Sequence, residues 1–123
     1  MENIKIPDAE LEIMMIIWDS IGGVTSEDIM SKLEGKKTWK RTTVLKFLSR
    51  LTERGFLSVE KKSKTNVYYP IIKQDDYLEY ECKNFLEKIC QNSVKKLVAT
   101  LYSSNTISDD DLAELKAFID KEQ

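Results

Sequence analysis

The residues best suited to bind a ligand are the long cations and short hydroxyls between Thr38 and Gly55. This stretch, TWKRTTVLKFLSRLTERG, interleaves Lys and Arg side chains with those of Thr and Ser. Such side chains donate hydrogen bonds to phosphate oxygens and to base edges in a DNA groove. A cationic helix face is also a common form of plain solvated surface. The neighbouring segments therefore decide between the two interpretations.

We expect eight residues of this stretch and of the hairpin after it to contact duplex DNA. Short hydroxyls and a central cation suit base edges, and cations further out suit phosphates. The base-edge candidates are Thr42, Thr43 and Lys46, and the phosphate candidates are Lys40, Arg41, Arg50, Lys62 and Lys64.

The sequence offers little for catalysis or for a metal ion. It has no histidine, so the commonest general base and metal ligand is missing, and it has no phosphate-binding glycine loop. Cys82 and Cys90 are eight positions apart, a little over two helical turns, so they cannot chelate one ion within a chain as a CxxC pair can. We therefore predict no enzyme, no catalytic or metal-binding residue and no cofactor. A metal site or redox pair between the cysteines of two chains stays open.

Charge is divided unevenly along the 123 residues. Residues 1–73 carry 13 basic and 10 acidic side chains, whereas residues 74–123 carry 6 and 11. This asymmetry favours a polyanionic partner for the first part despite a net charge of −2. The longest apolar run, Ile13–Trp18, is too short to span a bilayer, and the N-terminus lacks the order of a signal peptide. We expect a cytoplasmic protein without membrane insertion.

The pattern around the basic stretch predicts a helix-turn-helix. Val44, Leu48 and Leu51 recur at i, i+4 and i+7, which indicates a helix with one buried side that ends near Gly55. Thr25 is the expected N-cap of a short preceding helix. Asp8 is the expected N-cap of a first helix, whose buried face carries Leu11, Met14, Ile17, Trp18 and Ile21. Two helices joined by a short Gly-containing turn, the second of them basic, are typical of this DNA-binding unit.

Two β-rich runs after Gly55 predict a hairpin. Residues 57–61 and 67–71 flank a polar, lysine-bearing tip, and Val24 is a candidate for a short edge strand beside them. A hairpin directly after a recognition helix is a wing.

The C-terminal part predicts helices that need a partner. Apolar positions keep helical spacing from Tyr77 to Tyr102, which indicates one long helix with 91–93 as its expected break, and Ser108 is the expected N-cap of the last helix. Such faces are buried most economically against a second copy. The expected dimerisation residues are Leu78, Phe85, Leu86, Ile89, Leu97, Leu101, Leu112, Leu115 and Ile119. The predicted fold class is mainly α with a small β wing: a winged helix-turn-helix DNA-binding domain over 1–73 and a helical dimerisation domain over 74–123.

Several strings resemble the penicillinase-repressor (BlaI/MecI) family of winged-helix transcriptional repressors. The matching stretches are 9–14 with Ile17-Trp18, 39–51, 54–57 and 68–70, and looser ones follow at 83–85, 97–98 and 108–115. The resemblance implies a homodimer on a pseudo-palindromic operator that blocks transcription, with interlocked C-terminal helices.

The resemblance also implies a way to end repression. In this family a membrane sensor-protease responds to a β-lactam, and the repressor is then inactivated by a cut in its dimerisation part. The corresponding bond is Thr100-Leu101, where the staphylococcal repressors have Asn-Phe. Copper-responsive cousins carry a CxC pair that this chain lacks, which excludes copper sensing by that route. A regulator of another regulon with a ligand or redox signal, and a protein-interaction module without DNA, remain as alternatives.

Overall fold

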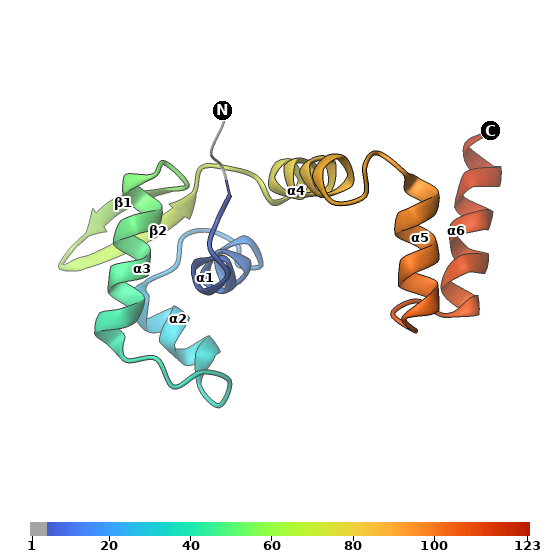
Figure 1. Cartoon of the computed structure of the whole chain (residues 1–123). Helices are drawn as coiled ribbons and strands as arrows, with labels where there is room; N and C mark the ends of the chain where they lie inside the picture. Colours follow the sequence, from blue (N-terminus) through green and yellow to red (C-terminus); the bar gives the residue numbers. More distant parts are fainter. Residues whose placement is uncertain (1–4) are drawn as a thin grey trace. The chain divides into compact units, whose positions relative to one another are not determined.

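The computed structural model describes residues 5–123, which form two compact units (Figure 1). The first unit ends at Glu79 and the second runs from Tyr80 to Gln123. In chain order the elements are α1 (Asp8–Trp18), α2 (Ser26–Leu33), α3 (Arg41–Glu53), β1 (Leu57–Lys62), β2 (Thr65–Pro70), α4 (Gln74–Lys88), α5 (Val94–Ser103) and α6 (Asp109–Glu122). A mostly helical chain with one small antiparallel sheet confirms the predicted fold class.

The core of the first unit is built from one apolar stripe on each of its three helices. Helix α3 contributes the core stripe Val44, Leu48 and Leu51, all fully buried as the periodicity predicted. The other fully buried large side chains include Ile13, Met14 and Ile17 of α1, Ile29 of α2, and Leu57 of β1. Burying each such side chain contributes about 1.5–3 kcal/mol. These stripes therefore hold the three helices and the hairpin together.

Helix α1 differs from its predicted boundaries at both ends. Pro7 is the N-cap and Asp8 is already helical, so no side chain caps this end. The helix stops at Trp18, and Ile21, expected on the buried face, is fully exposed because it lies beyond that end. Leu11 and Trp18 are half-buried rather than buried.

Local capping fixes the start of α2 and the end of α3. The Thr25 hydroxyl accepts a hydrogen bond from the Asp28 backbone N–H at 3.1 Å, and the Asp28 carboxylate accepts one from the Thr25 N–H at 2.9 Å. This reciprocal pair confirms the predicted N-cap. After α3, Gly55 has φ +85°, a left-handed conformation that glycine adopts without strain, so the chain turns directly into β1.

The hairpin packs onto the helices through both strands, β1 against α3 and β2 against α1. Strands β1 and β2 pair antiparallel from Leu57 opposite Pro70 to Lys62 opposite Thr65. Val24 forms the predicted short bridge: its N–H donates to the Tyr68 carbonyl at 3.0 Å, and the Tyr68 N–H donates back at 2.8 Å. Tyr68 is buried, so the hairpin is tied to the segment before α2.

The predicted long helix is two helices, α4 and α5. The break falls where the weak helix formers predicted it, because Gln91 and Asn92 adopt φ +53° and +62°. Helix α4 begins at Gln74, and Asp75 and Asp76 lie in its first turn. None of the helices in residues 5–123 combines the length and the hydropathy that a bilayer crossing requires.

The second unit has almost no interior of its own. Of residues 80–123, all of which are described, Cys90 alone is buried. The helices are instead ordered locally: Ser93 caps α5, and Ser108 forms a reciprocal cap with Asp111 at α6, as predicted for that position. The Tyr102 hydroxyl donates to Asp109 at 2.7 Å across the turn, which raises the pKa of Tyr102.

Tyr77 joins the start of α4 to the first unit. The buried Ile6 N–H donates to its hydroxyl at 2.8 Å, and its ring lies 5.8 Å from that of Trp18. The Trp18 indole N–H in turn donates to the Ile72 carbonyl at 2.9 Å.

We expect Tyr77→Phe to lower the free energy of unfolding by about 1–3 kcal/mol, because the buried Ile6 N–H loses its acceptor while the ring stays. Urea denaturation of the full chain measures the change. Tyr69→Phe is the matched control: Tyr69 is only half-buried, and we expect a loss within about 0.5 kcal/mol. Equal stability of Tyr77→Phe and the wild type would contradict this role.

Candidate nucleic-acid interface

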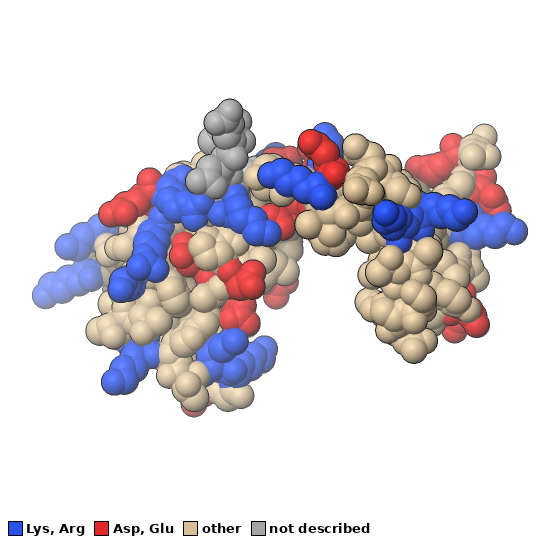
Figure 2. Space-filling model, in the orientation of Figure 1, with Lys and Arg blue, Asp and Glu red and all other residues tan. Residues whose placement is uncertain are grey.

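Burial of the core stripe turns the opposite side of α3 towards solvent. This outer face carries Thr42, Lys46 and Arg50 at i, i+4 and i+8, and all three are exposed. Figure 2 shows Lys and Arg side chains projecting from the part of the first unit that holds α3 and the hairpin. An exposed, cationic and hydroxyl-bearing helix face is what a DNA groove accepts.

Two predicted contacts lie beside the outer face rather than on it. Lys40 is the exposed N-cap residue of α3, before the first helical turn. Thr43 is half-buried, because it falls between the outer face and the core stripe. Thr42 and Lys46 therefore lie on the outer face, and Thr43 lies at its edge.

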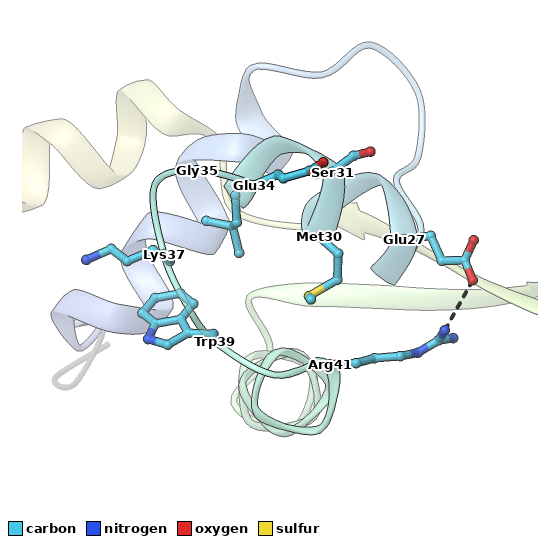
Figure 3. Close-up of a pocket in the computed structure, with 9 residues that line it drawn as sticks. Glu27, Met30, Ser31, Glu34, Gly35, Lys37, Trp39 and Arg41 are labelled. Carbon is cyan, nitrogen blue, oxygen red and sulfur yellow. Dashed lines mark hydrogen bonds and ion pairs between the residues drawn. The ribbon is translucent and has the colours of Figure 1, made fainter.

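Arg41 forms an ion pair that the sequence did not reveal. Its terminal nitrogen Nη1 lies 3.1 Å from Oε1 of Glu27, near the start of α2 (Figure 3). The two residues line a hollow of about 580 Å³ together with Met30 and Trp39. They are 14 positions apart and meet only because the turn between α2 and α3 folds back.

Trp39 anchors the segment that leads into α3. Its ring makes an edge contact with Phe47, with 5.2 Å between the ring centroids. The Lys37 ammonium nitrogen lies 5.4 Å from the centroid of the Trp39 ring and 3.2 Å from a carboxylate oxygen of Glu12. The contact between Trp39 and Phe47 thus ties the segment before α3 to the helix itself.

The hairpin brings one further predicted phosphate contact, Lys64, beside Arg41. Lys64 follows Ser63, which has φ +59° at the tip. Lys64 lines a second hollow, of about 410 Å³, together with Arg41, Glu27 and Asn66. Hydrogen bonding and charge from Tyr69, with a smaller contribution from Glu60, raise the pKa of Lys62, whose Nζ lies 5.6 Å from the Tyr69 ring centroid. Glu27 and Asn66 were not predicted here, since their proximity depends on how the hairpin folds onto α2.

The expected dimerisation residues fall into two groups by exposure. Leu78, Phe85, Ile89, Leu115 and Ile119 are exposed, and Leu86, Leu97, Leu101 and Leu112 are half-buried.

The bond between Thr100 and Leu101 lies inside α5. Thr100 is exposed and Leu101 is half-buried. Cys82 is exposed on α4, whereas Cys90 is buried at the break before α5.

Comparison with known proteins shows relatives along the whole chain. The penicillinase repressor of Bacillus licheniformis is 27% identical over 117 residues, which cover 95% of this chain and 91% of that protein. The methicillin resistance regulatory protein MecI of Staphylococcus aureus strain N315 is also 27% identical over 117 residues, covering 95% and 94%.

A solved structure matches about two thirds of the chain. The solution structure of the DNA binding domain of the repressor BlaI superposes with a TM-score of 0.54 at 35% identity, covering 63% of this chain and 94% of that one. The family profile described as penicillinase repressor matches residues 6–121. The chain therefore belongs to the penicillinase repressor family, which is a family of transcriptional repressors and not of enzymes.

Proposed function

We propose that this protein is a homodimeric repressor that binds a pseudo-palindromic operator and blocks transcription sterically. The observation that carries the proposal is α3, whose core stripe is buried while Thr42, Lys46 and Arg50 face solvent. Each α3 would enter a major groove, and the two-fold related copy would reach the groove about one helical turn, or roughly 34 Å, away. Residues 1–73 would bind DNA and residues 74–123 would dimerise, in the cytoplasm.

The proposed contacts follow the position of each side chain. Thr42 and Lys46 on the outer face, with Thr43 beside them, read base edges. The cations around them bind phosphates on both sides of the groove: Lys40, Arg41 and Arg50 from α3 and its N-cap, and Lys62 and Lys64 from the hairpin.

The exposed apolar surface of the C-terminal helices supports the dimer. Phe85, Ile89 and Ile119 are 47%, 66% and 45% exposed, and a second copy would cover them. Two linked DNA-binding units raise each other's effective concentration at the operator, so occupancy depends on the dimer.

Relatives named for penicillinase and methicillin resistance support a role in controlling β-lactam resistance genes. In that role a membrane sensor-protease would act on the dimerisation part, and the Thr100-Leu101 bond is the proposed cleavage point. Because this bond lies in α5, the helix must unfold locally before a protease can bind the segment in an extended conformation. Cutting there would separate α6 from the rest of the chain and weaken the dimer.

The test of the function is selection of genomic fragments by the purified protein at physiological salt, with random-sequence competitor present. We expect a short pseudo-palindrome, and the adjacent genes identify the signal. Weak, sequence-blind retention with little salt dependence would instead favour a protein-interaction module.

We expect Lys46→Ala to weaken binding to the selected operator by about 5- to 150-fold, the value of one base-edge contact. Lys116→Ala on α6 removes the same charge far along the chain, and we expect it to leave affinity within about twofold. Fluorescence anisotropy with the operator measures both. Equal effects of the two substitutions would contradict the assignment of α3 as the helix that contacts the bases.

We expect Ile119→Asp to shift the protein from dimer to monomer in sedimentation velocity and to weaken operator binding at least about tenfold. The reason is that a carboxylate would be buried without a partner at the interface. Ala117→Asp, also exposed and about 200° around α6 from Ile119, is the control that should remain dimeric. A stable Ile119→Asp dimer would reject the proposed interface.

A further inference from the structure

The Glu27–Arg41 ion pair leaves most of the arginine available for a ligand. The contact joins one terminal nitrogen of Arg41 to one oxygen of Glu27, at 3.1 Å. A guanidinium has five N–H donors, and among the described residues the Glu27 side chain alone bonds to them. The two side chains are 58% and 74% exposed, so the paired guanidinium is open to solvent.

Both partners lie at the starts of helices that packing or capping fixes. Arg41 is the first residue of α3, whose core stripe is fully buried. Glu27 is the second residue of α2, whose start is fixed by the reciprocal cap between Thr25 and Asp28. The Glu27 carboxylate therefore lies beside the N-terminal end of α3, the end whose residues contact base edges when such a helix enters a major groove.

The carboxylate also disfavours a phosphate at this point. Glu27 lines the same hollow as Arg41 and Lys64. Without it, both cations that line this hollow would attract a backbone phosphate. A negative charge beside them repels a phosphate, which carries a full charge, more strongly than it repels the neutral acceptor atoms of a base.

We propose that Glu27 is a positioning residue that converts Arg41 from a phosphate contact into a reader of a guanine edge. Glu27 holds one side of the guanidinium through the ion pair, and the remaining N–H groups donate to guanine O6 and N7. This is the commonest specific contact that arginine makes in the major groove. The inference rests on the proposed function and refines the phosphate contact assigned to Arg41 there.

The experiment selects bound sequences from a random duplex library with full-length wild type, Glu27→Gln and Arg41→Ala. Glu27→Gln keeps the side-chain shape, and the exposed position leaves the fold intact. We expect both substitutions to relax the preference for guanine at the same base pair of each half-site, by about 5- to 150-fold for Arg41→Ala. With Arg41 already replaced, adding Glu27→Gln should change no base preference.

A salt titration supplies a readout that a purely structural role would not move. Glu27→Gln frees the Arg41 charge for phosphate, so binding to a random-sequence duplex should tighten and its log–log salt slope should steepen by about 0.9 per protomer. Glu34→Gln is the matched control, since it removes the same charge just beyond the other end of α2, and it should leave every base preference unchanged.

The outcomes separate the inference from the function on which it rests. If Arg41→Ala lowers affinity uniformly and relaxes no base pair, Arg41 is a phosphate contact and the inference is wrong while the repressor stands. If Glu27→Gln behaves like Glu34→Gln, Glu27 does not position Arg41. A wild-type protein that selects no sequence would overturn both.

Discussion

The structure of the first unit depends on the burial of three side chains, Val44, Leu48 and Leu51, along one side of α3. Because an α-helix has a fixed period, this burial also determines which residues face solvent. The burial of these three side chains therefore stabilises the fold and also determines the direction in which the cationic face points. A change in the core would rotate or loosen α3 and misplace the outer face, even though no outer residue had changed.

The two units are stabilised by different means. The first has a closed interior, and a buried hydrogen bond from Ile6 to Tyr77 extends it to the start of α4. The second relies on capped helix starts at Ser93 and Ser108 and buries only Cys90 among its own residues. Caps contribute about 1 kcal/mol each, less than a packed interface supplies. The proposed dimer would provide the burial that the isolated unit lacks.

Sequence patterns predicted what depends on neighbours along the chain. They gave the core stripe, the Thr25 and Ser108 caps, the Gly55 turn and the break near Asn92, because each of these depends on a few adjacent residues. Apolar spacing alone could not show that α1 ends before Ile21, since the apolar pattern continues past Trp18. The Glu27–Arg41 ion pair could not be predicted from the sequence, because it depends on the angle between α2 and α3.

The hairpin has a consequence for how the protein behaves at high concentration. In the described part of the chain the sheet has two strands, so the far edge of β1 carries backbone groups without a neighbouring strand. Such an edge is a template for strand addition by another molecule and hence for aggregation. The outer half of β1 reads Glu60-Lys61-Lys62, and all three are exposed. The charges there discourage edge-to-edge pairing, so the edge of β1 can remain without a neighbouring strand beside α3.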